Sequence, residues 1–168
     1  MERKALADKI LVLGIDGMDP RKTRTFVDEG LMPHTKALIE RGAQRQDLVL
    51  LGGVPTITPP MWATLATGAS PTVHGITDFF LQVPGKLDEY TYAMHSESCK
   101  AEQMWNVFAE AGKKTLVWHW PSASWPPSSD SENLHVVDGS SPGGVNMSTA
   151  QCDAEVVLYA SEKADAVT

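Results

Sequence analysis

The sequence predicts an α/β fold, because apolar segments typical of buried strands alternate with segments typical of amphipathic helices. The aliphatic run at residues 9–14 is typical of a central strand of a parallel sheet, buried on both faces. Residues 113–120 form a further run of this kind, directly after a predicted helix. The order of these elements fits right-handed crossover connections between parallel strands.

Size and composition are those of a globular domain. The chain has 168 residues, of which 42% are hydrophobic and 21% charged, so we expect a single α/β domain over residues 1–168. The net charge of −7 argues against a nucleic-acid surface. It leaves an anionic substrate open, because a bound metal ion reverses the local field.

Cysteines and apolar runs bear on the compartment. Cys99 and Cys152 do not form a disulfide framework, and we expect two free thiols in a reducing compartment, with one bridge between them as the alternative. The apolar run at residues 10–15 is too short for a membrane segment, and the N-terminus has no convincing signal peptide. A cytoplasmic location is therefore expected.

The first helices carry clear start and stop signals. Asp19 is expected to cap a helix at 21–29, and Pro33 to begin a second helix that ends at Gly42. The other expected elements are a strand at 47–51, an extended segment at 77–83, a turn at 84–87, a strand at 89–94, a helix at 101–111, a loop at 121–131, a strand at 135–138 and either a strand or a helix at 155–160.

Residues 53–68 predict a loop that turns into a helix. Thr58 precedes Pro59, which pushes it into an extended conformation and makes it the expected N-cap. The helical pattern continues to Thr67, and Gly68 ends it. The Thr58 hydroxyl would then stand at the positive end of the helix dipole, where anions bind. The alternative is an ordinary threonine cap.

Two other polar residues follow apolar or turn segments. Asp16 comes directly after the first predicted strand, where α/β sheets place their ligands, although Asp-Gly is also a common turn signal. His74 lies beside Gly75 in a compact turn, and we expect it to be a satisfied structural group rather than a ligand.

Five short segments together resemble one family. They are residues 13–17, 32–38, 55–60, 66–68 and 74–76, in this order and spacing. The pattern is similar to the N-terminal half of the alkaline phosphatase superfamily, in its type I phosphodiesterase/nucleotide pyrophosphatase branch. Segments 104–114 and 121–127 also look like that branch, so the resemblance covers roughly residues 9–140. It implies a doubly wound, mostly parallel sheet flanked by helices, incomplete in this chain.

The resemblance also implies a two-metal site that holds Zn²⁺ or Mn²⁺. Asp16 matches a metal ligand, and Thr58 matches both the nucleophile and a metal ligand. The implied partner is a phosphate ester or phosphodiester, cleaved through a phospho-threonine intermediate. Nucleotide pyrophosphatases have an Asn that helps to hold the phosphate, and here Phe79 takes that position with Asp78 beside it. This departure weakens the inference of nucleotide specificity and makes these two residues candidate substrate contacts.

The remaining ligands of the family are absent from the sequence. The family adds an Asp-x-x-x-His, an Asp-His pair and a further His, and this chain has neither motif. We therefore expect the N-terminal portion of a longer enzyme, with an exposed sheet edge that favours self-association. The alternative is a non-catalytic or truncated α/β remnant or binding domain.

Overall fold

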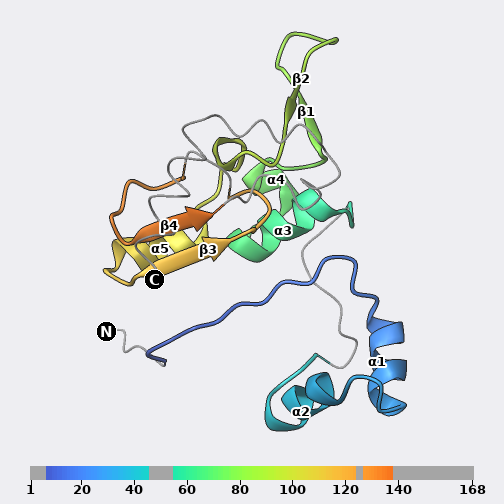
Figure 1. The fold of residues 1–168 in the computed structure, drawn as a ribbon. Coiled ribbons are helices and arrows are strands. Elements are labelled where there is room, and N and C mark those ends of the chain that lie inside the picture. Colours follow the sequence, from blue (N-terminus) through green and yellow to red (C-terminus); the bar gives the residue numbers. More distant parts are fainter. Residues whose placement is uncertain (1–6, 46–54, 124–126, 138–168) are drawn as a thin grey trace. The chain divides into compact units, whose positions relative to one another are not determined.

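The computed structural model describes residues 7–45, 55–123 and 127–137. The chain divides into two compact units, Met1–Val49 and Leu50–Thr168, which we call the N-terminal and the C-terminal unit. Figure 1 labels the helices and strands of both.

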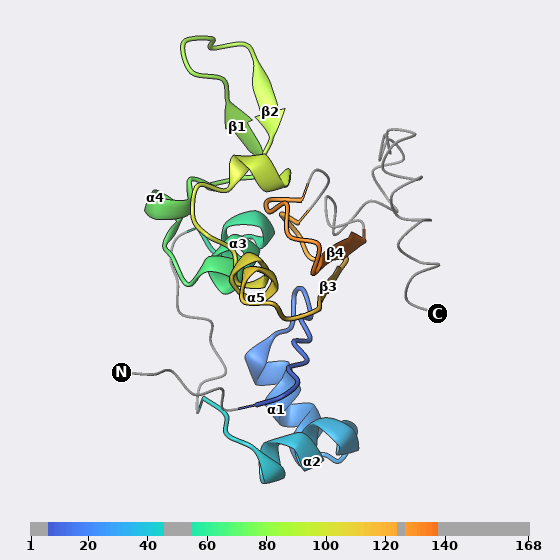
Figure 2. The same ribbon diagram turned by 90° about the vertical axis from the view of Figure 1, so that its left-hand side faces the viewer.

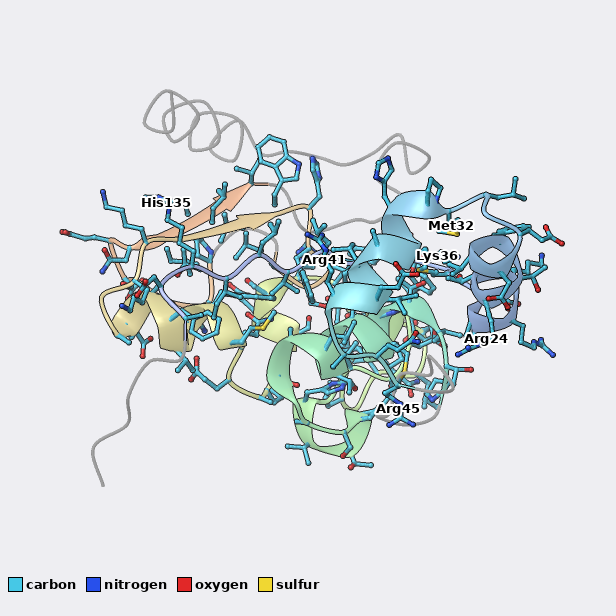
Figure 3. The ribbon with its side chains drawn as sticks, turned by 90° about the horizontal axis from the view of Figure 1, so that it is seen from below. Arg24, Met32, Lys36, Arg41, Arg45 and His135 are labelled. Carbon is cyan, nitrogen blue, oxygen red and sulfur yellow. The ribbon has the colours of Figure 1, made fainter. Side chains whose placement is uncertain are left out.

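Two helices form the described part of the N-terminal unit. α1 (Pro20–Asp28) contacts α2 (Pro33–Arg41), and Figure 3 labels side chains from both helices. Asp19 caps α1 as predicted, because its Oδ1 accepts hydrogen bonds from the backbone N–H groups of Arg21 (2.8 Å) and Lys22 (3.1 Å). These two bonds also hold the pKa of the Asp19 carboxyl below its ordinary value.

The predicted strand at residues 9–14 is not present. Its side chains are exposed, with Leu11 at 82% and Leu13 at 77%, and the backbone takes no regular structure. A strand needs a neighbour for its N–H and C=O groups, and the described residues of the N-terminal unit, 7–45, contain no other strand. The strand predicted at 47–51, the element predicted at 155–160 and Cys152 lie outside the described residues.

The described part of the C-terminal unit combines helices with two small sheets. Within residues 55–123 and 127–137, no helix is long and apolar enough to span a bilayer. In chain order the elements are α3 (Thr58–Thr67), α4 (Pro71–His74), β1 (Phe80–Gln82), β2 (Tyr90–Tyr92), the 3-10 turn η1 (Ser96–Ser98), α5 (Met104–Glu110), β3 (Thr115–Trp118) and β4 (Leu134–Val137).

The two sheets differ in direction. β1 and β2 form an antiparallel hairpin that projects away from the helices of this unit in both Figure 1 and Figure 2. β3 and β4 run parallel, with Thr115 opposite Leu134, and α5 packs against both strands. This parallel pair confirms the apolar runs predicted as strands at 113–120 and 135–138, and with the helices it supports an α/β fold.

The helix predicted at 101–111 is shorter in the structure. α5 ends at Glu110, so Ala111 is its C-cap and lies exposed instead of on the apolar face. The buried face is formed by Trp105 and Ala109, with Met104 packed beside it.

Helix α3 lies between two apolar clusters. Its Trp62 and Ala66 belong to the larger one, and its Ala63 belongs to a second cluster with Ile76 and Ala93. The other members of the larger cluster come from α5, β3, β4 and the turn after β3: Trp105, Ala109, Val117, Trp120, Ala123, Leu134 and Val136. Burial on two adjoining faces fixes the position of α3 within its unit.

Candidate functional site

The sequence predicts Thr58 as the N-cap of α3, and this prediction is wrong by one residue. Thr58 is instead the first residue of the helix. The N-cap is Ile57, with extended backbone angles (φ −119°, ψ 165°) and no capping bond from its side chain. Thr58 is helical although it precedes Pro59, so the proline restriction does not keep it out of the helix here. Pro59 and Pro60 then follow in the first turn, where the missing N–H groups break no intrahelical bond. Thr58 is half-buried, and it still stands at the N-terminal end of a ten-residue helix.

The first turn of α3 has few backbone donors. Pro59 and Pro60 carry no N–H, and both side chains are fully buried. The N–H of Met61 bonds to the carbonyl oxygen of Ile57 at 3.3 Å. Of the first three residues of α3, Thr58 is therefore the one with a backbone N–H, and it also carries a hydroxyl.

A buried histidine fastens α3 to the segment that follows it. The Nε2 atom of His74 lies 3.1 Å from Oγ1 of Thr64, in the middle of α3, and the backbone N–H of Ile76 donates to His74 Nδ1 at 3.1 Å. Burial lowers the pKa of His74, although the Pro60 carbonyl acts in the opposite direction. The prediction of a satisfied structural histidine is confirmed.

Asp16 lies in a turn of the N-terminal unit. Residues 16 and 17 form the turn, Gly17 has a positive φ of 64°, and the Asp16 side chain is exposed. The turn reading of Asp-Gly is therefore confirmed, while the strand expected before it is missing. Since Asp16 and Thr58 belong to different units, their role as a pair stays a prediction.

The candidate substrate contacts lie just before β1. The exposed Asp78 carboxylate accepts a hydrogen bond from the backbone N–H of Phe79 at 2.6 Å. The Phe79 carbonyl accepts from Ala93 N at 2.8 Å, which extends the β1–β2 hairpin by one bond. Asp78 therefore presents a carboxylate at the base of this hairpin, oriented by the backbone N–H of Phe79.

The remaining histidines lie on separate elements. His95 packs edge-on against Tyr92 with ring centroids 5.7 Å apart, and His119 packs against Trp118 at 5.4 Å. His135 lies on β4, as Figure 3 shows. Over residues 7–45, 55–123 and 127–137, no three His, Cys, Asp or Glu side chains gather in a group that could hold a metal ion.

One polar network in the structure was not predicted from the sequence. The buried Gln103 donates from Nε2 to the carbonyl of Ser122 (2.9 Å), and Ser128 Oγ lies 2.5 Å from Gln103 Oε1 and 3.1 Å from Asn106 Oδ1. Ser122 itself is buried with a positive φ of 72°. The network holds the loop after β3, at the carboxyl end of the parallel pair, where α/β folds place their ligands. The sequence offered only a Ser- and Pro-rich loop as a signal.

Comparison with known families identifies the class of protein. Residues 10–165 match the family described as "Type I phosphodiesterase / nucleotide pyrophosphatase". The match covers most of the chain, and the chain belongs to this family. This confirms the resemblance predicted from the five sequence segments.

Two solved structures are similar to the chain. One is phosphonoacetate hydrolase from Sinorhizobium meliloti 1021 in complex with phosphonoformate, with 32% identity and a TM-score of 0.53. The other is the same enzyme in complex with phosphonoacetate, with 31% identity and a TM-score of 0.53. Each comparison covers 61% of this chain and 24% of the hydrolase, so the chain spans about a quarter of that enzyme's length. A search of curated proteins found no significant match.

Proposed function

We propose that this chain supplies the nucleophile and one metal ligand of a metal-dependent phosphoester hydrolase, with Thr58 as nucleophile and Asp16 as ligand. The observation that carries the proposal is the place of Thr58. It is the first residue of a ten-residue helix, its turn is held by two buried prolines, and its segment is part of the family match. A hydroxyl at this position faces the field that favours negative charge on its oxygen.

The proposed reaction has two stages. In the first, Thr58 Oγ1 gives up its proton to water and bonds to phosphorus, while the bond from phosphorus to the leaving oxygen breaks and that oxygen takes up a proton from water. In the second, water cleaves the bond between Thr58 and phosphorus and restores the hydroxyl. The Thr58 backbone N–H and the N-terminus of α3 stabilise charge on the phosphoryl oxygens during both stages.

Two divalent metal ions, Zn²⁺ or Mn²⁺, would favour the Thr58 alkoxide and neutralise charge on the phosphoryl group. The Asp16 carboxylate and the Thr58 hydroxyl are oxygen donors that suit either ion. They are fewer than the roughly four ligands that zinc takes in proteins, so the site needs further ligands beyond these two residues.

The proposed substrate is a phosphate monoester or phosphodiester. The related hydrolase was solved with phosphonoformate and with phosphonoacetate, which also carry a phosphorus oxyanion, and this similarity supports the choice. Asp78 and Phe79 are proposed as outer substrate contacts. The exposed Asp78 carboxylate would accept a hydrogen bond from a substrate hydroxyl, with Phe79 beside it as an apolar surface.

The test compares Thr58→Ala with Thr58→Ser in the longest protein that contains this chain. The substrates are an aryl phosphodiester, an aryl phosphomonoester and phosphonoacetate, each with Zn²⁺ or Mn²⁺. We expect the alanine variant to lose turnover by roughly 1,000-fold or more, and the serine variant to keep part of it because a hydroxyl remains. Acid-quenched wild-type protein should carry a phosphoryl group on the peptide that contains Thr58. Asp16→Asn should lower the bound metal content.

Equal turnover by Thr58→Ala and wild type would end the nucleophile assignment. The chain would then be a non-catalytic α/β binding domain of the same family.

A further inference from the structure

We propose that His74 is a positioning residue for Thr58, a neutral imidazole with its proton on Nε2 that fixes the rotation and tilt of α3. This inference rests on the proposed function for its catalytic consequence, and on the geometry of the C-terminal unit for its physical basis. His74 is fully buried, and it is the last residue of the short helix α4, between α3 and β1.

The hydrogen bonds around the ring allow one protonation state. Nδ1 lies against the backbone N–H of Ile76, which can donate a hydrogen bond but cannot accept one. Nδ1 must therefore be the acceptor, so the ring is neutral and its proton is on Nε2. Nε2–H then donates to Oγ1 of Thr64 at 3.1 Å. In a charged imidazolium Nδ1 also carries a proton, so its N–H would point at the N–H of Ile76 with no acceptor between them.

The backbone around His74 is fixed as firmly as its ring. Its N–H donates to the carbonyl of Ser70 (3.0 Å), and its carbonyl accepts from Lys100 N (2.9 Å). The following Gly75 has a positive φ of 80°, and a Cβ there would stand 3.3 Å from Cγ of Lys100, so the turn admits only glycine without strain. The ring therefore projects from a rigid support.

The ring is bonded to the second turn of α3. Thr64, whose Oγ1 lies 3.1 Å from Nε2, is six residues after Thr58 in the same helix. Rotation or sliding of α3 away from the ring would break this buried hydrogen bond, which costs more than breaking an exposed one.

The direction of the Thr58 hydroxyl depends on this anchoring. Thr58 precedes two prolines whose φ angles are fixed, so its orientation follows that of the helix as a whole. Displacement of a reacting group by about 1 Å lowers turnover by on the order of 100-fold. His74 acts in this way through α3, without touching the substrate.

Two amide replacements of His74 test the roles of its two ring nitrogens separately. In His74→Gln the side-chain amide reaches the position of Nε2 and still donates toward Thr64. In His74→Asn the side-chain oxygen replaces Nδ1 as acceptor for Ile76 N–H, as in an Asx turn, but the chain is too short to reach α3. We expect His74→Asn to lower kcat by about 10- to 100-fold with little change in KM, and His74→Gln to keep most of kcat. Thr64→Val should resemble His74→Asn, and Thr64→Ser should resemble wild type.

Nitrogen-15 NMR of the histidines gives a readout that does not depend on activity. The expected spectrum shows His74 as the neutral Nε2–H tautomer at pH 7, and Thr64→Val should shift its Nε2 resonance. A charged ring or an Nδ1–H tautomer would overturn the inference. The inference would also be overturned if the glutamine and asparagine variants lost kcat equally and in proportion to their loss of thermal stability. His74 would then act only as a packing residue. Retained turnover in Thr58→Ala would instead remove the proposed function and leave the tautomer result standing.

Discussion

The indole rings of Trp62 and Trp120 meet edge to face, with ring centroids 4.9 Å apart and planes at 88°. Trp105 also packs against Trp120, with ring centroids 5.8 Å apart and planes at 66°, so Trp120 contacts a tryptophan from α3 and one from α5. Edge-to-face pairs of this kind add about 0.5–1.5 kcal/mol each to the energy of apolar burial. The turn after β3 is thereby joined to the helix that carries Thr58.

Replacement of Trp120 by alanine should lower the free energy of unfolding of the C-terminal unit by about 3–5 kcal/mol, because both aromatic pairs are lost and a cavity remains. Trp118→Ala is the matched control, since that side chain is 64% exposed and removes little buried surface. Urea titration followed by circular dichroism measures both. A similar midpoint for the two variants would contradict the assigned core.

Gln103 provides a second stability prediction. Replacement by alanine leaves the Ser122 carbonyl without its 2.9 Å donor and removes the nearer of the two acceptors of the Ser128 hydroxyl, so we expect a loss of about 1–3 kcal/mol. Gln82→Ala is the control, because its amide bonds to the carbonyl of Leu87 on the exposed hairpin. If the network holds the loop after β3, amide hydrogen exchange at Ser122 and Ala123 should speed up in Gln103→Ala and remain unchanged in the control.

Local signals predicted the helices and turns well, whereas signals that depend on distant partners did not. Asp19, Pro33 and Gly68 act within one helical turn, so the sequence alone determines their caps. The apolar run at residues 9–14 predicts a strand only if a neighbour pairs with it, and the pairing partner is not encoded in the run. Gln103 is similar: a glutamine predicts nothing until the fold brings Ser122 and Ser128 against it.

The candidate site shows the same division. The Thr-Pro-Pro sequence predicted a helix start at Thr58 to within one residue, because proline suits the first turn of a helix. His74 was expected to be structural, but its bond to Thr64, ten residues away, could not be read from the sequence. Its contact depends on how α4 packs against α3.

The burial of His74 predicts a pH dependence of stability. Its pKa in the folded chain lies below the ordinary value of 6.5, so the unfolded chain takes up the proton more readily. The contribution is complete above about pH 6.5 and is lost as the pH falls through the folded pKa. The difference in unfolding free energy between wild type and His74→Gln, measured by urea titration from pH 8 to pH 5, should therefore shrink or reverse toward low pH. A difference that stays constant over this range would show that His74 does not titrate between the two states.

The exposed face of β3 predicts self-association of the isolated chain. Leu116 (48% exposed) and Trp118 (64% exposed) alternate with the buried Val117, so they form an apolar face on the side of β3 away from the core. Among the described residues β3 pairs only with β4, which leaves unpaired backbone groups along a sheet edge. We expect a concentration-dependent increase in mass by sedimentation velocity, reduced by Trp118→Lys, which places a charge on the apolar face. Val107→Lys introduces the same charge on the exposed side of α5 and should leave the association unchanged. A monomer at all concentrations, or equal effects of the two lysines, would show that this face does not drive the association.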